Sequence, residues 1–285
     1  ADEVPEQPGA ATNILTNEPH FVGEPILAVA AVDETTAQNA IEAITLDLEP
    51  LPFCVDPLES LRPGGPNAYL EGNTVVPRQG VQELKWSAED FEAAEEGQLP
   101  MGEPGAEWSY GDLEAGFSET ALTLDETFVT ASHSHHSMEP RTALAYWENG
   151  KCHVRGSTQS QSFVVPGLAN YIGIEPENLV YVAEYCGGGF GSKGSAYPCM
   201  AIPAYMSKKT GRPVLMRISR AEEYYLGSAR PGFQGRIKIG FQEDGRISAV
   251  DLYIVQESGS NGGGGDMGAA ASAVSIVYTP LAMRY

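Results

Sequence analysis

The first 50 residues contain an apolar run, a helical pattern and a short alternating stretch. Residues 26–32 are all apolar, which is typical of a buried strand. Residues 33–44 place Ala and Ile three to four positions apart behind Asp33, a residue type that often caps a helix N-terminus. Residues 45–49 alternate apolar and polar side chains, as a strand with one buried face does. The pattern therefore predicts strand, helix and strand over residues 25–49.

Residues 55–120 are less regular. Residues 55–85 are rich in Pro and Gly and show little helical periodicity. Residues 86–119 hold the densest run of acidic residues together with several glycines, and we interpret them as a connecting segment with short order at 110–117. A second structured part is expected to begin near Ala121.

Beyond that point the pattern predicts strands interrupted by two helices. The expected strands cover residues 123–132, 144–147, 152–155, 179–185, 214–219, 235–241 and 247–255, and the expected helices cover residues 163–172 and 201–210. Asn149-Gly150 is a strong signal for a two-residue hairpin turn, and Gly211 suits the end of the second helix. A glycine-rich loop is expected at 259–265. Together the elements predict an α/β (α+β) chain in two parts.

Charge is distributed unevenly along the 285 residues. Residues 1–120 contain 24 acidic and 3 basic residues, whereas residues 121–285 contain 14 of each, so the net charge of −21 lies entirely in the first part. A chain this acidic is a poor candidate for binding nucleic acid or anionic membrane surfaces, because both attract basic side chains. No apolar stretch is long enough to span a membrane. The acidic part is interpreted as a solvated surface, with a surface that faces a partner subunit as the alternative.

The four cysteines stand at irregular spacings that match no zinc signature. Four thiols in a chain of this length do not make a disulfide scaffold. We therefore expect reduced, mostly buried thiols in a cytoplasmic protein. Cys186 is set apart from the others because it precedes a run of glycines.

The first candidate site is the sequence Tyr185-Cys-Gly-Gly-Gly-Phe-Gly-Ser-Lys193, which follows an expected strand. Its glycines would let a ligand lie against bare backbone, with N–H groups directed at anionic or oxo atoms. The spacing differs from that of a phosphate-binding P-loop and from that of the dinucleotide-binding Gly-x-Gly-x-x-Gly motif. A tight turn without a ligand is an equally good interpretation of these residues taken alone.

A second candidate is Ser157-Thr-Gln-Ser-Gln161, which follows another expected strand. The side-chain amide of Gln159 could donate a hydrogen bond to a bound oxo or carbonyl group. A helix-capping loop is the simpler interpretation of this motif by itself. No nucleophile elbow, pair of catalytic carboxylates or Cys/His nucleophile arrangement stands out elsewhere.

Two further clusters are weaker candidates for a site. His133-Ser-His-His-Ser-Met-Glu139 contains three histidines, but in an extended segment His133 and His135 share one face and His136 takes the other. We therefore expect a structural or cofactor-adjacent polar cluster there and no metal site. The mixed charges of Arg217–Glu223, together with Arg230, are expected to form ion pairs at a surface or an interface.

Taken in order, these motifs resemble the molybdenum-cofactor subunit of the xanthine dehydrogenase and aldehyde oxidase family, the molybdenum hydroxylases. The residues that carry the resemblance are Phe21-Val-Gly-Glu-Pro-Ile-Leu-Ala-Val-Ala, Glu49-Pro-Leu-Pro52, His135-His-Ser-Met-Glu-Pro-Arg141, Ser157-Thr-Gln159, Gly187-Gly-Gly-Phe-Gly-Ser-Lys193 and Thr210-Gly-Arg-Pro-Val214. They extend over nearly all of the chain, in the order and at the spacing of the family's landmarks.

The resemblance implies a small hammerhead-like α/β domain followed by a mixed α/β domain that binds molybdopterin. It divides the chain into a hammerhead-like domain at 1–107, a linker at 108–120 and the first molybdenum-cofactor-binding domain at 121–285. The first domain is expected to be incomplete at its N-terminus and the last at its C-terminus.

Members of this family hydroxylate aldehydes or N-heterocycles with oxygen taken from water. The resemblance implies molybdopterin, with or without an attached cytosine nucleotide, and 2Fe-2S clusters and FAD on partner subunits or domains. By position, Gln159 would face an oxo ligand of molybdenum, and Gly188, Gly189, Phe190 and Gly191 would form a loop whose amides approach the metal's ligands. The pterin holds the metal in this family, so no side-chain metal ligand is expected.

Two departures from the family pattern bear on activity. Purine-oxidising members carry a glutamate after the loop lysine, whereas Gly194 follows Lys193 here. Gly194 is therefore a candidate residue of the substrate pocket and does not favour a purine. The family's Arg-Gly-Phe-Gly loop and general-base glutamate are not found in this sequence. We thus expect no catalytic residue in this chain and place the base beyond residue 285 or in another chain.

The resemblance accordingly implies one part of a heteromeric oxidoreductase that acts on a small molecule. Its expected partners are the remainder of the molybdenum subunit, an Fe–S subunit and a flavin subunit. The alternative function is that of a catalytically inactive scaffold, or of a cofactor-insertion relative with the same fold.

Overall fold

The structure is a computed structural model that describes residues 14–17, 19, 21–50, 53–65, 85–227, 229–257 and 266–285. The glycine-rich loop expected at 259–265 lies outside these residues. No helix in the described part of the chain is both long and apolar enough to cross a membrane. The chain forms two compact units, the first from segments of Ala1–Pro50 and Ser134–Arg230 and the second from segments of Leu51–His133 and Pro231–Tyr285.

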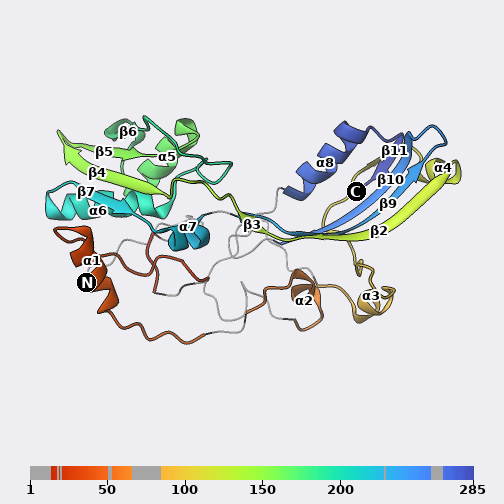
Figure 1. Ribbon diagram of the computed structural model, residues 1–285, viewed down its shortest axis with the longest axis horizontal. Coiled ribbons are helices and arrows are strands. Elements are labelled where there is room, and N and C mark those ends of the chain that lie inside the picture. The colour runs from red at the N-terminus through yellow and green to blue at the C-terminus, as the bar shows by residue number, and fades with distance from the viewer. Residues whose placement is uncertain are drawn as a thin grey trace. The chain divides into compact units, whose positions relative to one another are not determined.

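Both helices and strands occur among the described residues of each unit (Figure 1). The helices are α1 (Glu34–Glu42), α2 (Pro57–Leu61), α3 (Ala88–Glu92), α4 (Leu113–Ser118), α5 (Gln161–Ile172), α6 (Pro198–Thr210), α7 (Arg220–Leu226) and α8 (Asp266–Tyr278), with a 3-10 turn at Pro176–Asn178. The strands are β1 (Ser109–Tyr110), β2 (Leu122–Thr130), β3 (His133–Ser134), β4 (Thr142–Glu148), β5 (Lys151–Gly156), β6 (Leu179–Val182), β7 (Val214–Arg217), β8 (Ala229–Arg230), β9 (Phe233–Phe241), β10 (Ile247–Gln256) and β11 (Ala282–Arg284). The mixed α/β class expected from the sequence is confirmed.

The first unit is built on a four-stranded mixed sheet in the order β6-β5-β4-β7. The β4–β5 hairpin is the one predicted from Asn149-Gly150, and both turn residues have positive φ (51° and 77°), as a primed turn requires. β5, α5 and β6 form a parallel crossover, because β5 and β6 pair in the same direction. The parallel pair places the ends of β5 and β6 at one edge of the sheet.

Helices α5 and α6 pack against each other, and α6 also packs on β4 and β7. Both helices end at a glycine in the left-handed region, Gly173 and Gly211, as the sequence indicates. The core between these helices and the sheet is mainly apolar. Its fully buried members include Ala143, Ala145, Val154, Val164, Leu168 and Met200.

The second unit contains a five-stranded sheet in the order β1-β11-β10-β9-β2. The long strands β2 and β10 both pair antiparallel with β9, and all three fall on predicted strands. Helix α8 packs on β10 and contributes Ala271 to a small apolar core with Val250, Leu252 and Met283. Four helices, α2, α3, α7 and α8, were not predicted, and α4 overlaps the short order expected at 110–117. α7 carries a sequence signal, the Ser219/Glu222 capping box, and α8 contains an Ala-rich stretch of high helix propensity.

The predicted strand–helix–strand over residues 25–49 is correct only in its helix. α1 begins after Asp33, whose carboxylate accepts the N–H of Thr36, but residues 26–32 and 45–49 form no strand. The side chain of Val32 is 92% exposed. A strand needs a neighbour to pair its backbone groups, and neither apolar pattern specifies which segment that neighbour would be. The hammerhead-like domain and the boundaries at 107 and 120 stay predictions.

The cysteines are buried less generally than expected, because Cys54 is half-buried. Cys152 and Cys199 are buried and Cys186 is exposed, and burial raises the pKa of the Cys152 thiol to about 11. At pH 8 about one in a thousand Cys152 side chains is therefore a thiolate, the reactive form. Burial also raises the pKa of the Cys199 thiol. We expect iodoacetamide to alkylate Cys186 in the folded protein but to reach Cys152 and Cys199 only after unfolding.

Peptide mass spectrometry over a time course checks this expectation, with a urea-treated sample as the control for full reactivity. Equal labelling rates for Cys186 and Cys199 in the folded protein would contradict the buried placement. Because the pKa of Cys152 is higher in the folded than in the unfolded chain, folding retains the proton. The free energy of unfolding therefore decreases as pH rises above about 8.5, the ordinary pKa of a cysteine thiol.

Candidate cofactor-binding site

Three segments meet at one edge of the four-stranded sheet. Residues 157–159 follow β5 and residues 186–193 follow β6, and parallel neighbours end on the same side. Residues 137–141 lead into β4, which runs antiparallel to β5 and therefore begins where β5 ends. The sheet topology thus brings together three of the motifs that carry the family resemblance.

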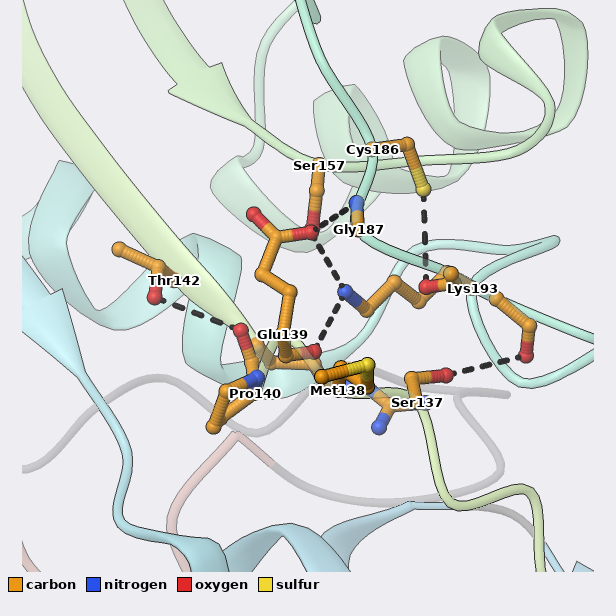
Figure 2. Close-up of polar contacts among 12 residues, drawn as sticks. Ser137, Met138, Glu139, Pro140, Thr142, Ser157, Cys186, Gly187 and Lys193 are labelled. Carbon is orange, nitrogen blue, oxygen red and sulfur yellow. Dashed lines mark hydrogen bonds and ion pairs between the residues drawn. The ribbon is translucent and has the colours of Figure 1, made fainter.

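An ion pair joins two of these segments (Figure 2). The ammonium of Lys193 donates to the backbone oxygen of Glu139 at 2.8 Å and to its carboxylate Oε2 at 2.9 Å. The same Oε2 accepts the backbone N–H of Gly187 at 2.7 Å. The side chain of Lys193 is fully buried, whereas that of Glu139 is 36% exposed. One carboxylate therefore contacts both ends of the glycine loop.

The surroundings of Glu139 favour its ionised form. Burial acts to raise the pKa of this carboxyl, but the Gly187 N–H, the Lys193 ammonium and the Ser157 hydroxyl outweigh it and hold the pKa below its usual range. An ionised carboxylate is what the buried Lys193 needs, because an unpaired buried cation is strongly unfavourable. The Lys193 ammonium therefore stabilises the ionised carboxylate of Glu139.

A second buried cation lies on the same segment. Arg141 is 2% exposed, and its guanidinium donates to the carboxylate of Glu223 in α7 and to the backbone oxygen of Ser192 in the loop. Its backbone N–H also donates to Glu223, at 2.7 Å. The guanidinium carbon lies 4.7 Å from the centroid of the Tyr197 ring. Arg141 thus links β4, α7 and the end of the glycine loop.

The side chain of Gln159 lies directly over the loop. Its Oε1 accepts the backbone N–H of Gly191 at 2.8 Å, which assigns the oxygen to that position because an N–H needs an acceptor. The Nε2 amide group is then directed away from Gly191, and no acceptor for it occurs among the described residues. Gln159 is exposed, so a bound group could reach Nε2, and the predicted role of this amide stays a prediction.

The side chain of Gln159 approaches the backbone of the glycine loop closely at Gly189. A Cβ atom at Gly189 would lie 2.3 Å from Gln159 Oε1, far inside van der Waals contact. The backbone of Gln159 donates to the oxygen of Lys193 at 3.1 Å, and the hydroxyl of Thr158 donates to the same oxygen at 2.8 Å. Gln159 is therefore held by its backbone at one end of the loop and by its side chain in the middle.

Phe190 stands out at the loop's tip. Its φ is 53°, a strained value for a residue with a side chain, and its ring is 64% exposed. Arg230 donates to the backbone oxygen of Phe190 and so supports this conformation. Gly188 and Gly191 on either side have φ of 103° and 109°, which only glycine adopts readily. Of the four predicted loop residues, Gly189 and Gly191 lie against the Gln159 side chain, and the cofactor-binding role of all four stays a prediction.

The remaining predicted residues are placed as follows. Gly194 is half-buried, and a Cβ there would meet only the Gly191 oxygen, at 3.4 Å, so the position tolerates a side chain. The histidines are dispersed, with the ring of His136 against Tyr224 and His135 beside Gly191. Within the described ranges no three His, Cys, Asp or Glu side chains gather in a way that could hold a metal ion.

The two buried ion pairs were not predicted from the sequence. Glu223 was expected in a surface or interface pair, but it is 6% exposed and pairs with Arg141, whereas Arg217 does form an exposed pair, with Glu34. Partners 82 residues apart leave no local signal in one sequence. A weaker signal was present in the motifs themselves. Glu139 and Arg141 lie at the end of one family motif, and Lys193 lies at the end of another.

At this edge, a glycine loop and an exposed amide side chain follow two parallel strands. This arrangement is typical of the class of proteins that bind a cofactor at the ends of such strands. The family of the molybdopterin cofactor-binding domain matches residues 96–285. The chain belongs to this family.

The chain is similar to larger proteins. It is 27% identical over 264 residues to the aldehyde oxidoreductase of Megalodesulfovibrio gigas, covering 89% of this chain and 25% of that protein. It is 27% identical over 258 residues to a probable xanthine dehydrogenase subunit of Bacillus subtilis, covering 90% of this chain and 30% of that one. The chain thus spans less than a third of the length of these relatives.

A similar fold occurs among solved structures. The quinoline 2-oxidoreductase of Pseudomonas putida has a TM-score of 0.62 at 23% identity, over 85% of this chain and 28% of that one. At this level of identity the similarity establishes the fold and nothing further.

Proposed function

We propose that this chain is one part of a molybdenum hydroxylase that oxidises an aldehyde or an N-heterocycle with oxygen taken from water. Family membership and the names of the aldehyde oxidoreductase and xanthine dehydrogenase relatives support this assignment. The single observation that carries it is the exposed side-chain amide of Gln159, whose Oε1 accepts the N–H of Gly191 in the glycine loop. That amide is a ready donor for an oxygen ligand of a metal group.

The residues of this edge fit a molybdenum–pterin cofactor. Gly188, Gly189 and Gly191 present bare backbone, and Gln159 offers Nε2 as a donor. The Gly191 amide is already bonded to Gln159, so the side chain and not that backbone group faces the ligand. When bound, the cofactor supplies the redox centre that takes two electrons from the substrate. The exposed ring of Phe190 would cover one side of it and exclude water.

The chemistry needs a general base that this site does not provide. Glu139 is the carboxylate within the loop network, but it is paired with Lys193 and its pKa lies below the usual range. A weakly basic, hydrogen-bonded carboxylate is a poor proton acceptor near neutral pH. We assign the base to a residue outside this sequence.

The proposed partners are the remainder of the molybdenum subunit and an Fe–S subunit, with FAD on a further subunit or domain. The name of the Bacillus subtilis relative describes a subunit, and that of a relative from Paenarthrobacter nicotinovorans describes a subunit of a dehydrogenase complex. Both names support an assembly of several chains.

The proposed substrate is not a purine, because Gly194 in the substrate pocket offers no carboxylate to bind one.

The test is metal and pterin analysis of the native complex, with every co-purifying chain identified by mass spectrometry. We expect one molybdenum per copy of this chain, together with a polypeptide that carries the missing glutamate. A purified chain with neither molybdenum nor a partner would contradict the proposal and favour the scaffold alternative.

A further inference from the structure

Lys193 is the most deeply buried charge at the site, with a fully buried side chain. Neither the family resemblance nor the proposed chemistry gives this ammonium a role. It lies at the end of the glycine loop and its partner, Glu139, lies 54 residues earlier in the chain. A cation in such a place requires an explanation, because burying it is unfavourable unless its partners are well placed.

The contacts of the pair coincide with the ends of the loop. Glu139 binds the loop's first amide, that of Gly187, and the ammonium of its last residue, Lys193. A Cβ at Gly187 would lie 2.5 Å from Glu139 Cβ, so the approach of these two segments is as close as the backbone allows. The pair therefore sets the distance between the two ends of the loop.

Lys193 also connects the loop to Gln159. Its backbone oxygen accepts from the Gln159 N–H and from the Thr158 hydroxyl, while its side chain is fixed on Glu139. A shift of Lys193 would thus move the backbone of Gln159 relative to Gly191, which its side chain contacts. The hydrogen bond between Gln159 and Gly191 orients the amide that faces the ligand.

We propose that Glu139 and Lys193 are positioning residues, which hold the glycine loop and thereby aim the Gln159 amide at the bound cofactor. The proposal rests on the proposed function, because aiming that amide matters only where a cofactor is bound. Stability alone is a poor explanation for the pair, since apolar side chains of similar volume usually stabilise a core as well as a buried ion pair does. Placement of a loop, in contrast, needs directional contacts.

The test uses the native complex with variants of the pair. Glu139→Ala removes the side-chain contacts to Gly187 and Lys193 but leaves the backbone oxygen of position 139 for Lys193, whereas Glu139→Gln keeps a side-chain oxygen that can accept from both. The matched control is Arg155→Met, which breaks an exposed ion pair with Glu184 on the same sheet. All variants are compared with the unaltered complex at equal molybdenum content.

The first measurement needs no cofactor, because it is hydrogen exchange of the amides in residues 186–194. We expect exchange about tenfold faster in Glu139→Ala, an intermediate change in Glu139→Gln, and no change in Arg155→Met. The second measurement is steady-state kinetics per molybdenum. For Glu139→Ala we expect kcat to fall about 100-fold with KM nearly unchanged, because a misaimed amide lowers the rate more than it lowers substrate binding.

The outcomes separate this inference from the proposed function. Unchanged exchange across 186–194 in Glu139→Ala overturns the positioning role, whatever the complex contains. If Glu139→Ala does not fold, unchanged exchange in Glu139→Gln overturns it instead. Faster exchange with kcat per molybdenum unchanged also overturns it, since the loop would then be loosened without consequence. An unaltered complex that contains no molybdenum refutes the proposed function alone.

Discussion

Replacing Arg141 by methionine is expected to lower the free energy of unfolding of the first unit by about 3–5 kcal/mol. The change leaves the carboxylate of Glu223 buried without its cation, and it frees the backbone oxygen of Ser192 from its donor. An uncompensated buried charge is among the most destabilising single changes. Methionine roughly fills the volume of the arginine stem. The decrease in the free energy of unfolding therefore reflects the unpaired charge more than a cavity.

The measurement is urea-induced unfolding followed by hydrogen exchange of the amides in β4 and β5, which report on this unit. The control is Arg217→Met, which breaks the exposed pair with Glu34, where both side chains are more than 60% exposed. Such a surface pair contributes about 0–1 kcal/mol. A loss for Arg141→Met no larger than that of the control would contradict the buried pair.

A double variant sharpens the interpretation. Adding Glu223→Gln to Arg141→Met removes the stranded charge but keeps an oxygen for the backbone N–H of position 141. We expect the double variant to be more stable than Arg141→Met alone by about 1–3 kcal/mol. If it is less stable, the loss in the single variant comes from packing and not from the buried carboxylate.

Replacing Gly189 by alanine is expected to lower kcat about 100-fold while the protein remains folded. The new Cβ would overlap Oε1 of Gln159. The atom that must move is the far end of a flexible side chain, so the fold tolerates the change and the amide gives way. Once displaced, Oε1 no longer accepts from Gly191 and Nε2 no longer points outward from the loop.

Steady-state kinetics of the native complex, normalised to its molybdenum content, checks this result beside a thermal unfolding curve. Gly105→Ala is the matched control, since a Cβ there meets nothing within 4 Å. We expect the Gly189→Ala unfolding midpoint to stay within a few degrees of the control. Full activity in Gly189→Ala would show that the Gln159 amide takes no part in the reaction.

The local structure of the first unit follows from the sequence for clear physical reasons. The turn at Asn149-Gly150 needs two residues that accept positive φ, and only a few residue types do. Gly173 and Gly211 end their helices for the same reason. These signals act between neighbours in the chain, so one sequence is enough to recognise them.

The site was predictable in part. Gln159 and the glycine loop each follow an expected strand, and the parallel pairing of β5 and β6 brings them to one edge. The strands predicted at 26–32 and 45–49 were wrong, because hydrophobicity predicts burial but does not supply the partner that makes a strand. The burial of Glu223 was likewise invisible in its charged local sequence.

By itself, the sequence determined the class of the fold, the helix ends and turns, and the motifs that identify the family. These depend on backbone conformation and hydrophobic period, which are properties of short segments. Only the tertiary structure decided that Lys193 and Arg141 are buried, that each has a carboxylate partner, and that Gln159 Oε1 accepts the N–H of Gly191. Those facts depend on distances between residues 32 to 82 positions apart in the chain, and such distances arise only when the sheet brings the segments together.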